Sequence, residues 1–160
     1  RSMKRVSKAN AEITVNEREP IATEEQYALF RLYQQSRHAS GDMARMDFVD
    51  YRALIEETPV ESTVLEFRDF EGCLVGACLI DRVANGLSAV YSFFDPDLSS
   101  QSLGTYIILW LIEHAKKQEL PYVYLGFWVD ECDKMSYKAK FQPLEHYSPS
   151  GWKLLSESPE

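Results

Sequence analysis

Residues 87–128, LSAVYSFFDPDLSSQSLGTYIILWLIEHAKKQELPYVYLGFW, decide the fold. The segment 87–94 is rich in β-branched and aromatic residues, which predicts a strand. Residues 103–117 then place apolar side chains at helical spacing, and 122–128 is again apolar and aromatic. A strand, a crossover helix and a second strand form a β-α-β unit, so the two strands are expected to be parallel neighbours.

The rest of the chain adds helices and strands on both sides of this unit. The predicted elements are helices at 24–38, 47–56 and 133–140, and strands at 63–68, 73–82 and 151–155. Asn85-Gly86 predicts a hairpin before the strand 87–94, and Gly76 is a candidate bulge. Thr23 and Gln26 fit a capping box at the first helix. The order α-α-β-β-β-α-β-α-β predicts an α+β fold whose mixed, mostly antiparallel sheet is flanked by helices.

Length and charge limit the function. At 160 residues the chain is about one domain, and its net charge of −8 argues against binding DNA or RNA through bulk charge. Three cysteines without a Cys-x-x-Cys pair argue against a disulfide scaffold or a zinc ribbon and favour the cytoplasm. Cys73 and Cys78 are expected to be buried strand residues. No apolar run is long enough to span a bilayer, so no membrane partner is expected.

A lysine-rich stretch, Asp130–Pro143, stands out in this acidic chain. Wound as an α-helix, it would place Lys134, Tyr137, Lys138 and Phe141 on one face, suited to a carboxylate or a phosphate. The alternative is a solvated helix whose acidic start and basic end complement the helix dipole.

A basic cluster lies at the N-terminus, in Arg1–Lys8, and it is either a solvated segment or part of a path for RNA. Because the chain lacks an initiator methionine, we expect that an upstream part has been removed. The expected organisation is a basic lead-in segment over 1–22, one folded domain over 23–155 and a polar tail over 156–160.

Several segments together resemble the arginyl-tRNA–protein transferase family, and its bacterial branch most of all. They are LSAVYSFFDP (87–96), SLGTY (102–106), YVYLG (122–126), KMSYKAKFQP (134–143), RSMKRV (1–6) and YQQSRH (33–38). The resemblance covers nearly the whole chain in one order. The order of elements also matches the fold of Gcn5-related N-acetyltransferases (GNAT), in which two parallel strands splay apart and the reacting carbonyl sits between them.

The resemblance implies transfer of leucine or arginine from a charged tRNA to the α-amino group of proteins that begin with Asp or Glu, in the N-degron pathway of protein degradation. Its partners would be aminoacyl-tRNA, as co-substrate, and the acidic protein substrates, with no further cofactor and no metal in this domain. The family also has an N-terminal module with clustered cysteines, which this chain lacks.

Three groups of candidate site residues follow from the resemblance and from the chemistry of ester aminolysis. The catalytic candidates are His38, Tyr91, Asp95 and Tyr137. The candidates for binding the acceptor carboxylate are Arg37, Lys134 and Lys138, and Lys138→Ala is expected to lose acceptor binding with the fold intact. The candidates for binding the tRNA end or the aminoacyl group are Ser102, Gly104, Tyr106, Tyr124 and Lys140.

Structural alternatives exist for several of these residues. His38 could be a polar residue at a helix end, Asp95 a cap at the end of a strand and Ser102 a plain helix N-cap. Core aromatic packing is the alternative for Tyr91, Tyr124 and Tyr137. Two other functions also compete. One is an acetyl-CoA–dependent N-acetyltransferase, against which Gln101–Gly104 argues because it keeps only part of a pyrophosphate loop. The other is a non-catalytic reader of acidic N-termini.

Overall fold

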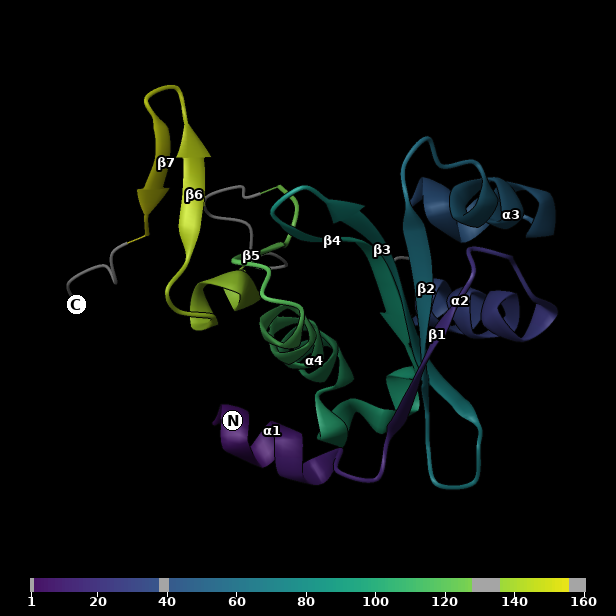
Figure 1. The fold of residues 1–160 in the computed structure, drawn as a ribbon. Helices are drawn as coiled ribbons and strands as arrows, with labels where there is room; N and C mark the ends of the chain where they lie inside the picture. Colours follow the sequence, from purple (N-terminus) through teal and green to yellow (C-terminus); the bar gives the residue numbers. More distant parts are fainter. Residues whose placement is uncertain (1, 38–40, 128–135, 156–160) are drawn as a thin grey trace. The chain divides into compact units, whose positions relative to one another are not determined.

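The computed structural model describes residues 2–37, 41–127 and 136–155 (Figure 1). The chain divides into two compact units, Arg1–Tyr124 and Leu125–Glu160. The helices of the first unit are α1 (Met3–Ala9), α2 (Glu24–Arg37), α3 (Phe48–Glu56) and α4 (Leu103–Lys117), with 3-10 turns at η1 (Asp42–Arg45) and η2 (Pro96–Gln101). Its strands are β1 (Thr14–Arg18), β2 (Ser62–Arg68), β3 (Leu74–Val83), β4 (Gly86–Phe94) and β5 (Tyr122–Tyr124).

The five strands form one mixed sheet in the order β1-β2-β3-β4-β5. The pairs from β1 to β4 are antiparallel, and β4 pairs with β5 in parallel, which confirms the predicted β-α-β unit. Helices α2 and α3 cover one face of the sheet and α4 the other (Figure 1). Neighbouring residues of β2 show this alternation, because Phe67 contacts Trp110 of α4 while Glu66 bonds to Gln26 of α2.

The main predicted elements are found close to their predicted ends. The Thr23–Gln26 capping box forms at the start of α2, with Gln26 N donating to Thr23 Oγ1 and Thr23 N to Gln26 Oε1. The hairpin at Asn85-Gly86 is also present, with Val83 paired to Gly86. The core between the layers is aromatic and aliphatic, with Phe30, Phe67 and Leu111 fully buried.

Some expectations from the sequence were wrong. Residues 1–22 contain α1 and β1, neither of which was predicted, and β1 adds a fourth antiparallel strand. The bulge lies at Val75 rather than at Gly76, because Phe67 pairs with Gly76 and Arg68 with Leu74. Cys73 is exposed in the turn before β3, whereas Cys78 is buried as expected.

The second unit contains a 3-10 helix, η3 (Ser136–Lys140), and a hairpin of β6 (Glu145–Ser148) and β7 (Gly151–Leu154). The expected last strand is therefore present, and it pairs with a strand that was not fully predicted. Where a helix was expected over 133–140, the described part is a short 3-10 turn and not an α-helix. Across the described residues of the chain, every helix is too short or too polar to cross a bilayer.

Gly86 allows β5 to approach β4 closely. A Cβ atom at Gly86 would lie 2.4 Å from the carbonyl oxygen of Tyr122 and 3.0 Å from the ring of Tyr124. We expect Gly86→Ala to lower the free energy of unfolding by about 1–3 kcal/mol, because backbone atoms have to move apart. Gly76→Ala is the matched strand control, since its nearest neighbour would be an ordinary 3.5 Å away. Urea unfolding compares the two variants, and equal losses would contradict the prediction.

Candidate functional site

The parallel pairing of β4 with β5 is short, because β5 ends at Tyr124. Their pairing runs from Gly86 with Tyr122 to Ser88 with Tyr124, whereas β4 continues to Phe94. Just beyond Ser88, Val90 is the extra residue of a β-bulge opposite β3. No described strand pairs with this edge of β4 beyond Ser88.

An aromatic cluster surrounds Phe94 at the end of β4. The ring of Phe94 lies 5.0 Å from that of Tyr33 on α2, and the guanidinium of Arg37 lies 5.1 Å from its centroid. On its other side Phe94 meets α4, where a Cβ at Gly104 would come within 2.9 Å of the ring. The fold therefore brings Arg37 and Gly104, two predicted site residues, to the same side chain.

Arg37 is exposed and its position is set by stacking. Its guanidinium lies over both Phe94 and, at 6.0 Å, Tyr33. Between the described residues, no hydrogen bond or ion pair involves this guanidinium. Stacking leaves the N–H edge of an arginine available, and that edge fits a carboxylate bidentately.

Tyr91 lies on β4 just past the bulge and faces α2. The buried amide of Gln34 donates a hydrogen bond from Nε2 to the Tyr91 hydroxyl. Burial raises the pKa of Tyr91 to about 12, with Tyr33 adding to the shift and the Gln34 bond opposing it. Tyr91 is therefore a neutral hydroxyl at physiological pH. Because Gln34 occupies its oxygen as a donor, the Tyr91 hydrogen is directed elsewhere.

Gln34 was missed by the sequence analysis, although it is almost completely buried. Its Oε1 has no hydrogen-bond partner among the described residues. A buried, unpartnered amide oxygen is costly and calls for a reason. Two signals in the sequence pointed to Gln34: it lies one helical turn before Arg37, and it belongs to the family-like segment YQQSRH (33–38).

The segment that joins β4 to α4 holds Asp95 and Ser102. Asp95 Oδ1 accepts a hydrogen bond from Asp97 N at 2.9 Å, so Asp95 caps the start of η2 directly after β4. This agrees with the alternative that Asp95 is a capping residue. Ser102 occupies the N-cap position of α4, but its side chain makes no capping bond and its φ is 56°. Left-handed backbone at a non-glycine residue is strained, and such strain gathers at functional sites.

Tyr106 and Tyr124 lie in other surroundings. Tyr106 is half-buried on α4 and meets Phe67 edge-on, with ring centroids 6.1 Å apart, on the face of the sheet opposite Tyr91. Burial raises its pKa. The Tyr124 hydroxyl donates to Asn85 Oδ1 at 2.9 Å, at the start of the parallel pair.

The described residues of the predicted cationic face in the second unit do not lie together. Lys138 and Phe141 are buried, whereas Tyr137 is 38% exposed, so Tyr137 and Lys138 do not share a face. The described residues form a 3-10 helix, in which neighbouring side chains lie about 120° apart, so the face drawn for an α-helix does not apply to them. Lys138 Nζ donates to the carbonyl of Phe127 at 2.5 Å. The expectation that Lys138→Ala spares the fold is therefore revised, while Lys140 remains exposed.

Two predicted residues, His38 and Lys134, lie outside the described residues. Their proposed roles as base and carboxylate ligand remain predictions.

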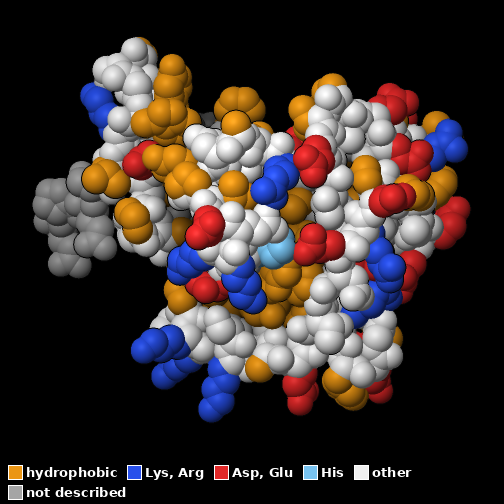
Figure 2. Space-filling model, in the orientation of Figure 1, with side chains coloured by type: hydrophobic (Ala, Val, Ile, Leu, Met, Phe, Trp, Pro, Cys, Tyr) orange, Lys and Arg blue, Asp and Glu red, His pale blue; other side chains and the backbone are white. Residues whose placement is uncertain are grey.

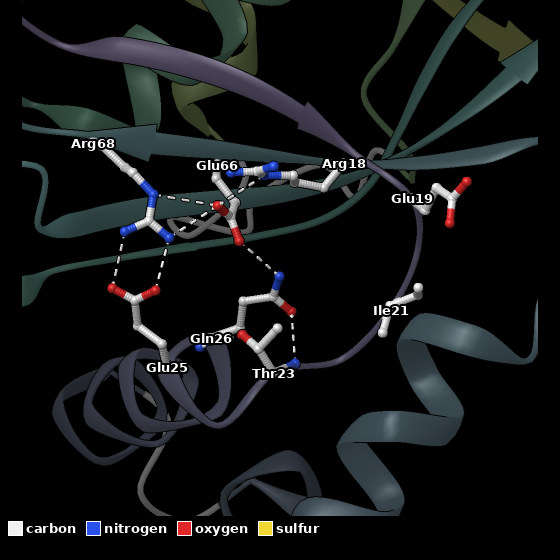
Figure 3. A pocket seen from close by; sticks show the side chains of 8 residues that line it. All are labelled: Arg18, Glu19, Ile21, Thr23, Glu25, Gln26, Glu66 and Arg68. Carbon is white, nitrogen blue, oxygen red and sulfur yellow. Dashed lines mark hydrogen bonds and ion pairs between the residues drawn. The ribbon is translucent and has the colours of Figure 1, made fainter.

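A second feature of the first unit is an open pocket of about 490 Å³ beside β1 and β2 (Figure 3). The buried carboxylate of Glu66 bonds to Gln26 Nε2 at 3.0 Å and to Arg68 at 2.9 Å. Arg68 also makes a bidentate pair with Glu25, at 2.9 and 2.7 Å. The hydroxyl of Tyr51 donates to Gln26 Oε1 at 3.2 Å. Since these groups satisfy one another, the network is structural rather than a binding site.

The turn from β2 to β3 brings Asp69, Glu71 and Cys73 together within 4.8 Å. The carboxylate of Asp69 accepts hydrogen bonds from the backbone N–H of Glu71 and of Cys73. These bonds explain the cluster as a tight turn.

Known proteins share both the sequence and the fold of the chain. The family described as arginine-tRNA-protein transferase, C terminus, matches residues 25–148. The aspartate/glutamate leucyltransferase of Paramagnetospirillum magneticum is 54% identical over 98% of this chain and 64% of its own length. The aspartate/glutamate leucyltransferase of Granulibacter bethesdensis is 48% identical over 99% of this chain and 59% of its own length. The chain thus spans less than two thirds of these relatives.

The fold comparison agrees with the predicted architecture. A solved acetyltransferase of the GNAT family from Staphylococcus aureus has a TM-score of 0.55 at 18% identity, over 89% of this chain and 93% of that chain. At this identity the likeness concerns the fold alone, and it confirms the predicted GNAT-like α+β fold.

Proposed function

Residues 25–148 match the C-terminal region of the arginine-tRNA-protein transferase family, so the chain belongs to this family. We propose that it carries the acyl-transfer domain of an aminoacyl-tRNA–protein transferase. The donor is a charged tRNA, and leucine is the favoured amino acid because the named relatives are leucyltransferases. The acceptor is the α-amino group of a protein that begins with Asp or Glu. The observation that carries the proposal is the family match, which includes all of β4, α4 and β5.

The proposed chemistry is aminolysis of an ester. The neutral α-amine attacks the ester carbonyl, a C–N bond forms, and the tetrahedral intermediate releases the tRNA hydroxyl, which takes up the proton lost by the amine. The ester is already activated, so alignment of the two substrates supplies much of the rate. An α-amine with a pKa near 8 is partly neutral at pH 7, so a weak base or water suffices. Since charged tRNA is a product of the cytoplasm, we place the reaction there.

Two groups of the first unit support specific roles. Arg37, held over Phe94, binds the side-chain carboxylate of the acceptor. Tyr91 donates a hydrogen bond to the oxygen on which negative charge develops. Donor and acceptor are proposed to meet beside β4 beyond Ser88, where its pairing with β5 ends.

One assay tests the proposal and its competitors. The protein is incubated with leucyl-tRNA, arginyl-tRNA or acetyl-CoA, and with peptides that begin with Asp, Glu or Ala. We expect transfer of leucine to the Asp and Glu peptides only. Binding of acidic peptides without any transfer would favour a reader of N-termini, and acetylation would favour an acetyltransferase. Either result would overturn the proposal.

Arg37→Gln tests the acceptor site. We expect the KM for a peptide beginning with Asp to rise about 10–100-fold, because a charge-assisted pair contributes about 1.5–3 kcal/mol. Arg31→Gln is the matched control, since Arg31 is also an exposed α2 arginine, stacked at 5.9 Å over Tyr27. Steady-state kinetics measure both variants. An equal rise in the two, or no rise in Arg37→Gln, would remove Arg37 from the site.

A further inference from the structure

The N-terminal helix α1 carries positive charge on one side only. Lys4, Arg5 and Lys8 are exposed, and at 100° per residue they lie within an arc of about 100°. Val6 lies on the opposite side and is 2% exposed. The surface made by the three cations is called here the α1 basic face. Figure 2 shows Lys and Arg side chains along the lower edge of the molecule, where Figure 1 draws α1.

Acidic groups do not neutralise this face. The first acidic residue in the chain is Glu12, and no ion pair between described residues involves Lys4, Arg5 or Lys8. By contrast, Arg68 is paired with carboxylates. In a protein of net charge −8, an unneutralised group of three cations is a local exception. It suits a polyanion rather than a single carboxylate.

The helix is also held in place next to the candidate site. Asn10, which is 1% exposed, caps α1 and donates from Nδ2 to Val6 O at 2.8 Å and to Gln101 O at 2.9 Å. Gln101 directly precedes the Ser102–Gly104 segment that begins α4, and Gly104 contacts Phe94. One end of α1 is thereby joined to the segment on which the proposed acyl-transfer site is built.

We propose that the α1 basic face binds the phosphate backbone of the acceptor stem of the donor tRNA. The inference rests on the proposed function, which supplies an RNA whose 3′ end must enter the site. Lys4 to Lys8 covers about 6 Å of the helix axis, and the long side chains extend this reach to two or three successive phosphates of one strand. Three cations on one side of α1 suit such a row of phosphates. The contact is sequence-independent, so it positions the tRNA without selecting its amino acid.

Salt-dependent tRNA binding tests this surface. The variant Lys4→Gln/Arg5→Gln/Lys8→Gln keeps good helix formers and removes the charge. We expect its Kd for tRNA, measured by fluorescence anisotropy, to rise about tenfold or more at moderate salt. The slope of log K against log salt should fall by about 2–3, since each phosphate contact contributes about 0.7–0.9. The variant Lys4→Arg/Arg5→Lys/Lys8→Arg should bind as the unmodified chain does.

A second triple variant controls for total charge. Arg31→Gln/Arg45→Gln/Arg52→Gln removes three exposed cations from α2, η1 and α3, and we expect nearly unchanged tRNA binding. Equal losses of tRNA binding in the two Gln triples, or an unchanged salt slope in the α1 triple, would overturn the assignment while leaving the proposed transfer intact.

If the unmodified chain binds no tRNA, the proposed function falls as well. The KM for the acceptor peptide should stay constant in the α1 triple, and a parallel rise would contradict a role confined to tRNA.

Discussion

Replacing Arg68 by methionine is expected to lower the free energy of unfolding by about 3–5 kcal/mol, the range for removing one partner of a buried ion pair. Arg68 joins the buried carboxylate of Glu66 to that of Glu25 and so ties β2 to α2. Methionine keeps most of the apolar stem of the arginine. The remaining partners of the Glu66 carboxylate are then Gln26, which donates a hydrogen bond, and the exposed Arg18 at 3.6 Å. A carboxylate that is 4% exposed then lacks its main counter-charge.

The pH dependence of stability should change in the same variant. The hydrogen bond from Arg68 holds the pKa of Glu25 below its ordinary value of 4.5. A carboxyl group whose pKa is lowered by folding adds stability above its unfolded pKa and loses it as the pH falls through the folded value. We therefore expect the unmodified chain to lose stability below about pH 4.5 through this group. In Arg68→Met that part of the acid sensitivity should disappear.

Urea unfolding at neutral and acidic pH measures both effects. Lys116→Met is the control, because Lys116 forms an exposed pair with Glu113 at 2.8 Å. Exposed pairs contribute about 0–1 kcal/mol, so this control should change little. A comparable loss in the two variants would show that the Glu66 network is not a main source of stability.

The elements that the sequence predicted well are those with long apolar patterns. The helix α4 and the strand β4 carry long, strong patterns, and their bounds were predicted within one residue. The strand β1 is five residues long, and the polar sequence TVNER gives no apolar alternation to detect. It is an edge strand that pairs only with β2, so its side chains did not need to be apolar.

The candidate site was partly predictable for a different reason. Arg37 and Gly104 lie in segments that resemble a known family, and the fold brings both to Phe94. Gln34 and Glu66 were missed because a polar residue in a helix or strand is usually exposed. Both are buried because α2 packs on the sheet: Gln34 lies on the helix and Glu66 on β2. Only the tertiary packing of α2 reveals that these side chains must be bonded.

Tyr91→Phe should lower the kcat of aminoacyl transfer by about 10²–10³-fold, the usual cost of removing one donor to a developing oxyanion. The phenol of Tyr91 stays protonated at the working pH, since burial raises its pKa to about 12. Gln34 Nε2 donates to its oxygen, so the hydroxyl hydrogen is not used in that bond. The KM for the acceptor should change little, because the lost bond forms mainly in the transition state.

Tyr51→Phe is the control for a buried hydroxyl. Its hydroxyl bonds to Gln26 Oε1, within the structural network. Its loss should cost about 1 kcal/mol of stability and leave kcat unchanged. Full activity in Tyr91→Phe, or an equal loss of kcat in Tyr51→Phe, would exclude Tyr91 as the donor.

Gln34→Glu separates positioning from packing. A carboxylate at this position accepts the hydrogen of Tyr91 and withdraws it from the carbonyl, so kcat should fall at neutral pH in a folded protein. Lowering the pH protonates the introduced carboxyl, which then donates to the Tyr91 oxygen, and kcat should recover relative to the unmodified chain. A packing defect would give a loss of kcat that does not depend on pH. In the Tyr91→Phe background the Gln34→Glu change should have no further effect on kcat, because Gln34 acts only through the hydroxyl that is already missing.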